Sequence, residues 1–244
     1  TQSGMLLVDQ ARTVLREVKL LKEMASNQGK EMTGPLHIGL IPTVGPYLLP
    51  YIVPTLKETF PDLEVFLYEA QTHQLLEQLE TGRLDCAIVA RVPETEAFIE
   101  VPIFDEKMLL AVSDQHPWAS ESKIAMNTLK GQEMLMLDDG HCLRNQALDY
   151  CFTAGAKEDS HFQATSLETL RNMVAANAGI TFMPELAVLN EGTRAGVKYI
   201  PCHSPEPSRT IALVYRPGSP LRNRYERVAS AVSEQVKSIL ANKK

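Results

Sequence analysis

Hydrophobic and polar residues follow a helical period at the beginning of the chain. Apolar residues recur there at alternating spacings of four and three, at Leu7, Ala11, Val14, Val18, Leu21 and Ala25. This a/d seam predicts a helix over Met5–Ala25 that pairs with a second helix, although a helix packed against its own domain would show a similar stripe. The polar segment Ser26–Thr33 that follows is typical of a hinge.

From Gly34 onward, short apolar runs alternate with segments of helical period, which predicts βαβ units and an α/β fold with parallel strands. Strands are expected at Leu36–Ile41, Leu63–Glu69, Leu84–Ala90, Lys107–Val112, Glu133–Leu137, Phe162–Thr165, Ile180–Met183, Val197–Ile200 and Thr210–Tyr215. Helices are expected at Pro46–Thr59, Thr72–Thr81, Ala125–Lys130, Leu143–Phe152 and Leu221–Ala241. One more helix is expected to begin with a capping box of Thr165 and Glu168 and to end at Gly179.

Composition and charge narrow the classes of function. The 244 residues are 44% hydrophobic and 22% charged, as in globular proteins, and no apolar run is long enough to cross a membrane. A net charge of −6 argues against nucleic-acid binding by this chain itself. No motif for a metal, a nucleotide or another cofactor is present, so we expect none of these. Without a secretion signal, the four cysteines are expected to be reduced thiols in the cytoplasm.

The stretch His141–Cys151 holds the most informative candidate chemistry. It reads H-C-L-R-N-Q-A-L-D-Y-C and follows an Asp138-Asp139-Gly140 turn, where an Asp beside the helical pattern is an N-cap signal. Cys142 is therefore predicted in the first turn of a helix, with His141 and Arg144 as positive or potentially positive neighbours. These are conditions that make a thiol nucleophilic.

The second cysteine of the stretch follows nine positions later in the sequence. One unbroken helix would separate the pair by about 13 Å and half a turn, whereas a disulfide needs Cα atoms about 4.4–6.8 Å apart. A bond between Cys142 and Cys151 would therefore dismantle the helix between them, as a redox switch requires. The alternative is two unrelated cysteines, one at the surface and one in the core.

This stretch resembles the redox segment of the hydrogen-peroxide sensors among the LysR-type transcriptional regulators. Four further segments carry the resemblance, which covers essentially the whole chain: GPLHIGLIPTVGPYLLP (Gly34–Pro50), EAQTH (Glu69–His73), ATSLETLRNMVAA (Ala164–Ala176) and VYRPGSPLR (Val214–Arg222). An Asp often follows the Arg of H-C-L-R in that family, whereas this chain has Asn145.

The resemblance implies a periplasmic-binding-protein-like fold of two Rossmann-like subdomains. Residues 34–105 plus 211–244 would form the first subdomain, and residues 106–210 the second, which carries the redox cysteines. Residues 1–27 would be the tail of a linker and dimerisation helix. Since the chain starts at Thr1, we expect a fragment that lacks the N-terminal winged helix-turn-helix.

The resemblance also implies a chemistry and a set of partners. Cys142 would be the peroxidatic cysteine, oxidised by hydrogen peroxide to sulfenate, and Cys151 the resolving cysteine that closes a reversible disulfide. Residues that support the peroxide or the oxidised segment would converge at the ends of strands: Thr43, Thr72, His73, His141 and Arg209. Expected partners are a second copy in a dimer or tetramer, promoter DNA and RNA polymerase through the full-length protein, and a glutaredoxin- or glutathione-type reductant.

Two other functions remain open for the chain. A small-solute effector domain would use the same fold, and a thiol peroxidase would use the same cysteine chemistry. Because the sequence contains no other catalytic constellation, we expect a regulator rather than an enzyme. Cys86, within the predicted strand Leu84–Ala90, and Cys202, in the sequence I-P-C, are expected to be inert core residues.

Overall fold

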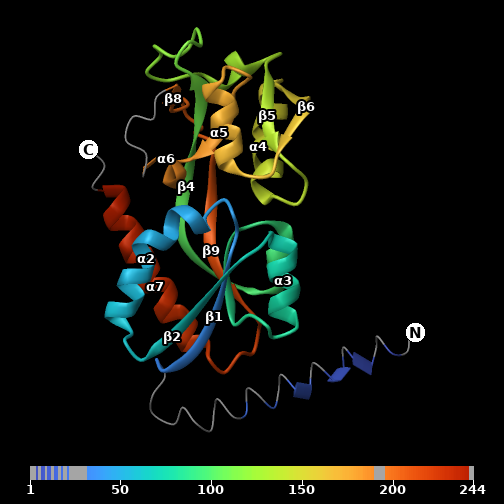
Figure 1. Ribbon diagram of the computed structural model, residues 1–244, viewed down its shortest axis with the longest axis vertical. Coiled ribbons are helices and arrows are strands. Elements are labelled where there is room, and N and C mark those ends of the chain that lie inside the picture. The colour runs from blue at the N-terminus through green and yellow to red at the C-terminus, as the bar shows by residue number, and fades with distance from the viewer. Residues whose placement is uncertain are drawn as a thin grey trace. The chain divides into compact units, whose positions relative to one another are not determined.

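The structure is a computed structural model that describes residues 32–189 and 196–241, except for the side chains of Phe152, Ser160 and His161 (Figure 1). It also describes a set of helical positions near the N-terminus: Gly4, Leu7, Val8, Gln10, Ala11, Val14, Leu15, Val18 and Leu21. The apolar residues among these are exposed, including Leu7 at 72%, Val14 at 53% and Leu21 at 65%. The rest of the predicted helix over Met5–Ala25, and most of the predicted hinge, lie outside the described residues.

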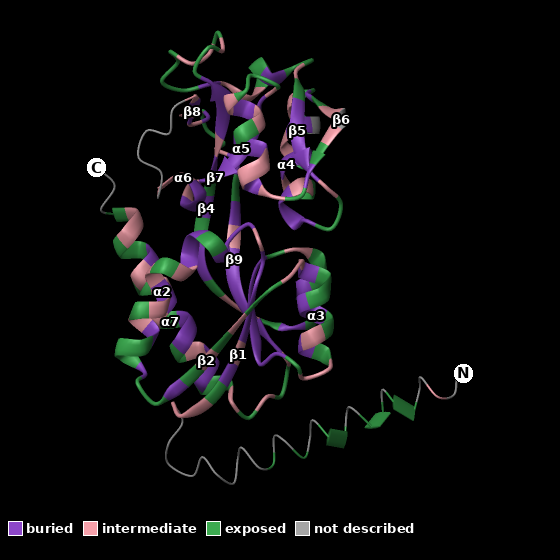
Figure 2. Cartoon of the chain, viewed as in Figure 1, coloured by how far each residue is buried: buried purple, intermediate pink, exposed green. Residues whose placement is uncertain are grey.

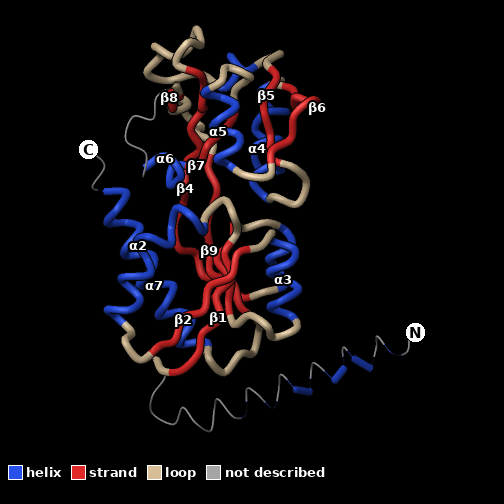
Figure 3. Tube along the Cα trace, in the orientation of Figure 1, coloured by secondary structure: helices blue, strands red, loops and turns tan. Residues whose placement is uncertain are grey.

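The chain divides into two compact units. Unit 1 holds residues 1–41, 49–104 and 211–244, and unit 2 holds residues 42–48 and 105–210. The segment Pro42–Leu48, which the predicted boundaries assign to the first subdomain, belongs to unit 2. Two long strands, β4 (Ile99–Ser113) and β9 (Ser208–Tyr215), contribute to both units (Figure 3).

Unit 1 is built on β1, whose two neighbours run parallel to it, while β9 pairs antiparallel with one of those neighbours. The parallel strands are β1 (Gly34–Leu40), β2 (Leu63–Glu69) and β3 (Cys86–Ala90), and β9 pairs with β3. The helices are α2 (Gly45–Thr59), α3 (Thr72–Glu80) and α7 (Arg222–Ala241). In Figure 1, α2 and α7 lie on one side of these strands and α3 lies on the other.

A glycine allows α3 to pack closely on the sheet of unit 1. A Cβ at Gly39 would meet Leu75 of α3 at 2.6 Å and Leu84 at 2.7 Å, so a side chain at that position would push the helix away. On the other side of β1, Leu36 and Ile38 are fully buried. β3 is buried along its length, which fits its continuous apolar sequence. Figure 2 shows buried residues gathered in the central strands of unit 1.

Unit 2 places two helices against a short parallel pair of strands. The pair is β5 (Glu133–Leu137) and β6 (Lys157–Ala164), and the helices α4 (Cys142–Ala154) and α5 (Leu167–Ala175) both contact β5. The remaining strands, β7 (Thr181–Pro184) and β8 (Val197–Ile200), pair antiparallel with β4, contrary to the prediction of parallel strands.

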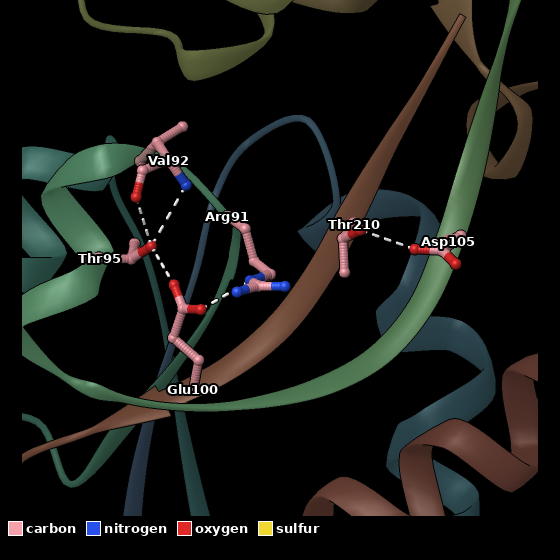
Figure 4. Close-up of polar contacts among 6 residues, drawn as sticks. All are labelled: Arg91, Val92, Thr95, Glu100, Asp105 and Thr210. Carbon is pink, nitrogen blue, oxygen red and sulfur yellow. Dashed lines mark hydrogen bonds and ion pairs between the residues drawn. The ribbon is translucent and has the colours of Figure 1, made fainter. Parts of the chain in front are cut away.

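Polar contacts fix β4 within each unit (Figure 4). In unit 2, the Thr210 hydroxyl on β9 donates to Asp105 Oδ1 on β4 at 2.7 Å. In unit 1, the carboxylate of Glu100 accepts from Arg91 Nε at 2.6 Å and from the buried hydroxyl of Thr95. Thr95 lies in η1 (Pro93–Ala97), so this contact ties the turn to β4.

Several predicted elements differ locally from the structure. The helix predicted at Ala125–Lys130 is a single 3₁₀ turn, η2 (Met126–Leu129), and α6 (Glu185–Leu189) was not predicted. The N-cap of α5 is Ser166 rather than Thr165, because Ser166 Oγ accepts from Thr169 N at 3.2 Å.

The end of α5 also differs from the prediction. The helix ends at Ala175, and Asn177 takes the left-handed conformation with φ 60°. Gly179 has a packing role instead, because a Cβ there would meet Leu135 Cγ at 2.8 Å. No helix in the described part of the chain has the length and apolar character to span a membrane.

Candidate functional site

A sharp turn brings Cys142 to the first position of α4. β5 ends at Leu137, and Gly140 takes φ 94°, a left-handed conformation that suits glycine. The helix begins at Cys142, as predicted, but His141 directly precedes it, so neither Asp138 nor Asp139 occupies the position predicted for an N-cap. Instead, Asp138 Oδ1 lies 3.2 Å from Nε2 of His141, which is buried.

Cys142 occupies the first position of α4. The first N–H groups of a helix have no partner within the helix, and the helix dipole is positive there. Cys142 is largely buried, at 9% exposure. A helix N-terminus is a position at which reactive cysteines occur in proteins.

Arg144 does not act as the positive neighbour of Cys142 that the sequence predicts. Its Nη2 donates to both carboxylate oxygens of Glu158 on β6, at 2.8 and 2.9 Å, and its Nε lies 3.4 Å from Asp139 Oδ1. The guanidinium is thus neutralised by carboxylates. Its effect is to pin the first turn of α4 to β6, not to act as an uncompensated charge beside Cys142.

Cys151 has a different environment from Cys142, although the same helix carries it. Cys151 is fully buried, and its Sγ lies 3.0 Å from the Sδ of Met134 on β5. Burial raises the pKa of the Cys151 thiol to about 12. The group is therefore a neutral thiol at neutral pH and a poor nucleophile where it lies.

The cysteines predicted to be inert are buried. Burial and the charge of Glu206 raise the pKa of Cys202 to about 11. Burial, together with Asp85, raises the pKa of Cys86 well above its usual value. All four cysteines, each within the described residues, are free thiols. Because α4 is continuous from Cys142 to beyond Cys151, this pair is about 13 Å apart along the helix axis and cannot bond without a rearrangement.

Thr43 is held by a buried ion pair within unit 2. Arg209 Nη1 donates to Thr43 Oγ1 at 2.9 Å, and Arg209 Nη2 donates to the Thr43 carbonyl at 3.1 Å. The same guanidinium contacts Glu106 Oε2 through Nε at 2.8 Å and Nη2 at 2.7 Å. The other oxygen of Glu106 accepts from Leu186 N at 3.0 Å. Arg209 therefore fixes the Thr43 hydroxyl, rather than offering its charge to a substrate.

The other two predicted site residues, Thr72 and His73, begin α3 of unit 1. Thr72 is 7% exposed, and its Oγ1 has no hydrogen-bond partner among the described residues. His73 is exposed. A buried hydroxyl without a partner costs free energy and is typical of a site that awaits a ligand or water. That these residues converge with Cys142 stays a prediction.

One face of α4 borders a groove with a volume of about 660 Å³. On this face, the Tyr150 hydroxyl donates to the Ser208 carbonyl at 2.9 Å and accepts from Ser208 N at 3.2 Å. Ser208 begins β9 and directly precedes Arg209. The groove is lined by Met126, Asn127, Gln146, Asp149, Tyr150, Thr153, Ala154, Pro205 and Ser208.

Sequence reasoning missed Glu106, Met134, Tyr150 and Glu158. The partner of each lies at least 14 positions away in the chain, up to 103 for Glu106 and Arg209. No local sequence motif predicts such pairs. Glu106 directly precedes the strand predicted at Lys107–Val112, so nothing local indicated that its carboxylate would be buried in β4 and need a partner.

Comparison with known proteins identifies the family. Residues 29–237 match the LysR substrate binding domain. Over 98% of its length, the chain is 93% identical to the hydrogen peroxide-inducible genes activator of Haemophilus influenzae, covering 80% of that protein. Over 95% of its length, it is 69% identical to the DNA-binding transcriptional dual regulator OxyR of Escherichia coli K12, covering 76% of that protein.

The fold agrees with this relationship. The crystal structure of the oxidised form of OxyR, 63% identical in sequence, superimposes with a TM-score of 0.79 over 85% of this chain and 98% of that one. The predicted α/β fold of the LysR regulatory type is thereby confirmed.

Proposed function

Because the chain belongs to the family of LysR substrate-binding domains and, within it, to the hydrogen peroxide-inducible gene activators, we propose that Cys142 and Cys151 are its redox pair. The chain is the regulatory domain of a peroxide-responsive transcription regulator. The contrast between two sulfurs on one helix carries the assignment. Cys142 lies at the N-terminus of α4, whereas Cys151 is a buried thiol whose pKa is raised to about 12.

The first step consumes peroxide at Cys142. The thiolate attacks one oxygen of hydrogen peroxide, an S–O bond forms, and the O–O bond breaks. The second oxygen leaves as hydroxide and takes a proton to become water, and Cys142 is left as a sulfenic acid. Donors near the leaving oxygen lower the barrier by stabilising its negative charge.

Thr43 is suited to supply such a donor. Its oxygen accepts a hydrogen bond from Arg209, so the hydrogen of the hydroxyl is available to a peroxide oxygen. Arg209 acts through Thr43 as a positioning residue. Thr72, with its buried unpartnered hydroxyl, and the two histidines His73 and His141 complete the proposed set.

The second step closes the disulfide and rearranges α4. Cys151 loses its proton and attacks the sulfur of the sulfenic acid; the S–S bond forms, the S–O bond breaks, and the oxygen leaves as water. In total, two thiols are oxidised and one peroxide is reduced to two waters. Because the pair cannot meet along an intact helix, α4 must unwind in part.

The effect on transcription would come from the rearrangement of α4 that follows the reaction of the cysteines. We propose that the rearranged segment changes packing between copies in a dimer or tetramer. The linker helix would then transmit the change to a winged helix-turn-helix, which contacts promoter DNA and affects RNA polymerase. A glutaredoxin- or glutathione-type reductant in the cytoplasm would restore the thiols.

Sulfenate trapping tests the roles of the two cysteines. After a stoichiometric peroxide pulse, Cys151→Ser should accumulate trapped sulfenate at Cys142, and Cys142→Ser should not react at this peroxide level. Cys202→Ser is the matched control and should behave like the parent protein. If Cys142→Ser is oxidised at Cys151 as fast as the parent protein is oxidised, the assignment is wrong.

A regulator is also distinguished from a thiol peroxidase by turnover. We expect one equivalent of peroxide to be consumed per chain, with further consumption limited by slow reduction of the disulfide even in excess small thiol. Sustained rapid turnover would instead indicate an enzyme. Tight binding of a metabolite, together with thiols that do not react with dilute peroxide, would indicate a solute-binding domain.

A further inference from the structure

The thiol of Cys151 has a specific partner in the core. Its Sγ lies 3.0 Å from the Sδ of Met134, in the geometry of an S–H group donating to a thioether. Both residues are fully buried. A thiol is a weak donor and a thioether a weak acceptor, but water does not compete for either in a close-packed core.

The two sulfurs lie on two different elements: β5 is anchored by its neighbours, whereas α4 must unwind for the disulfide to form. Met134 lies on β5, next to Leu135, whose N–H donates to Ile180 O at 2.8 Å and whose carbonyl accepts from the Thr181 hydroxyl at 2.8 Å. These bonds anchor β5 on one side, and parallel pairing with β6 anchors it on the other. Cys151 lies on α4, the element that must unwind for the disulfide to form.

We propose that Met134 is a positioning residue for the second step of the switch: its thioether holds the Cys151 thiol in the core and must release it before Cys151 can reach Cys142. This inference rests on the proposed role of Cys151 and deepens it. The contact stabilises the reduced arrangement of α4 at the resolving cysteine. It has no part in the attack of Cys142 on peroxide.

The contact also couples the position of the sulfur to its reactivity. While Cys151 donates to Met134, the thiol keeps its proton, and its raised pKa makes the anion scarce. Once the sulfur leaves the core, it can lose the proton to water and attack the sulfenic acid of Cys142. The S–S bond then forms as the S–O bond breaks and water leaves. Release and activation of Cys151 are thus one event.

The test replaces the thioether by a side chain of similar size. Met134→Leu removes the acceptor and keeps an apolar residue at this position. The matched control is Met136→Leu, because Met136 lies on the same strand and is also buried, at 2% exposure. Rapid mixing with peroxide should resolve sulfenate formation from disulfide formation in each protein.

We expect Met134→Leu to accelerate only the second phase, by about three- to tenfold, which corresponds to about 0.7–1.4 kcal/mol. The Met136 variant should leave both phases unchanged. An unchanged or slower second phase in Met134→Leu would overturn the proposal. Equal acceleration by Met136→Leu would also overturn it, because a loosened core would then be the cause.

An infrared measurement on the parent protein keeps the proposal testable if Met134→Leu does not fold. The S–H stretching band of Cys151, identified by its loss in Cys151→Ser, should lie at lower frequency than that of a thiol in an apolar solvent. A band at the frequency of the unbonded thiol would overturn the proposal. Failure of the parent protein to form any disulfide would instead contradict the proposed function.

Discussion

At the scale of single residues, surroundings rather than residue type separate the two cysteines of α4. Cys142 lies in the first turn of α4, whereas Cys151 is enclosed by the core and by the thioether of Met134. The sequence showed the first of these environments, because a turn followed by a helical pattern places a residue at a helix start. It could not show the second, because Met134 lies 17 positions away on another element.

The buried thiols should make the reduced protein less stable at high pH. An unfolded cysteine ionises near pH 8.5, whereas the pKa of Cys151 in the folded state is raised to about 12. Below about pH 8.5 both states hold the proton and the contribution is complete; above it the unfolded state loses the proton first. The free energy of unfolding should then fall by up to about 1.4 kcal/mol per pH unit for this thiol.

Urea unfolding of the reduced protein between about pH 7.5 and 10.5 measures this slope. Cys151→Ala should give a shallower decline than the parent protein, whatever its stability at neutral pH. Cys202, whose pKa is raised to about 11, should contribute in the same direction. Identical slopes in the parent protein and Cys151→Ala would contradict the prediction.

The Thr43 hydroxyl should matter for oxidation more than for folding. Thr43→Val keeps the shape but removes the acceptor of Arg209 Nη1 and the proposed donor to peroxide. Loss of a hydrogen bond to a charged group costs about 1.5–3 kcal/mol, or about one to two decades in rate if the whole effect falls on the transition state. Stopped-flow oxidation of Cys142 measures it. Thr43→Ser, which restores a hydroxyl, should recover most of the rate; equal rates in all three proteins would remove Thr43 from the site.

At the scale of elements, α4 is restrained along its length by contacts to its neighbours. Arg144 ties its first turn to Glu158 of β6, Cys151 contacts Met134 of β5, and Tyr150 holds the backbone of Ser208. Hydrophobic periodicity predicted that this helix exists and nearly where it begins and ends. The contacts that restrain it were hidden, because each joins residues far apart in the chain.

The difference between local sequence pattern and contacts to distant residues also explains the wrong predictions at other elements. Ala125–Lys130 has a helical pattern, yet its length allows only one turn, and a segment so short takes the conformation its surroundings impose. Ser166 and Thr165 are both N-cap residues by type, so sequence alone could not decide between them. Gly179 marks close packing against Leu135 instead of a helix end.

Removal of the Tyr150 hydroxyl should loosen α4 at the end that carries Cys151. Tyr150→Phe keeps the ring but removes both hydrogen bonds to Ser208. Each neutral hydrogen bond contributes about 0.5–1.5 kcal/mol net, so the loss of both costs about 1–3 kcal/mol and local opening of the helix should become about five- to 150-fold more frequent. Hydrogen exchange over residues 142–154 measures this. Tyr68→Phe, which alters a tyrosine of unit 1, is the control; protection of α4 unchanged in Tyr150→Phe would refute the prediction.

At the scale of the whole molecule, we predict that exposed apolar residues near the N-terminus take part in self-association. Leu7, Val14 and Leu21 follow the predicted a/d spacing and are exposed in the single chain. A charge on such a seam would be buried without a partner in a paired helix. Val14→Asp combined with Leu21→Asp should therefore shift the protein toward monomer in sedimentation analysis. Gln10→Asp, at an exposed position off the seam, should not; an oligomer unaffected by the double variant would place the interface elsewhere.

Oxidation should change the molecule far more than the formation of one covalent bond would suggest. A bond between Cys142 and Cys151 requires the loss of helical turns in α4, each turn giving up hydrogen bonds that contribute about 0.5–1.5 kcal/mol apiece. Leu143, Ala147 and Leu148, which are buried in the reduced arrangement, must then find new neighbours. The disulfide offsets this cost, because its formation is coupled to oxidation by peroxide and to the redox poise of the cell.

Hydrogen exchange and sedimentation of the reduced and disulfide forms measure this rearrangement. Protection over residues 141–154 should be lost or redistributed in the disulfide form, and self-association should change with it, because surfaces that pack on this segment are altered. Cys151→Ser treated with peroxide is the decisive control, since it carries the sulfenate but cannot close the bond. It should exchange like the reduced protein. If it instead reproduces the change seen in the disulfide form, oxidation of Cys142 alone operates the switch, and the unwinding of α4 is not its cause.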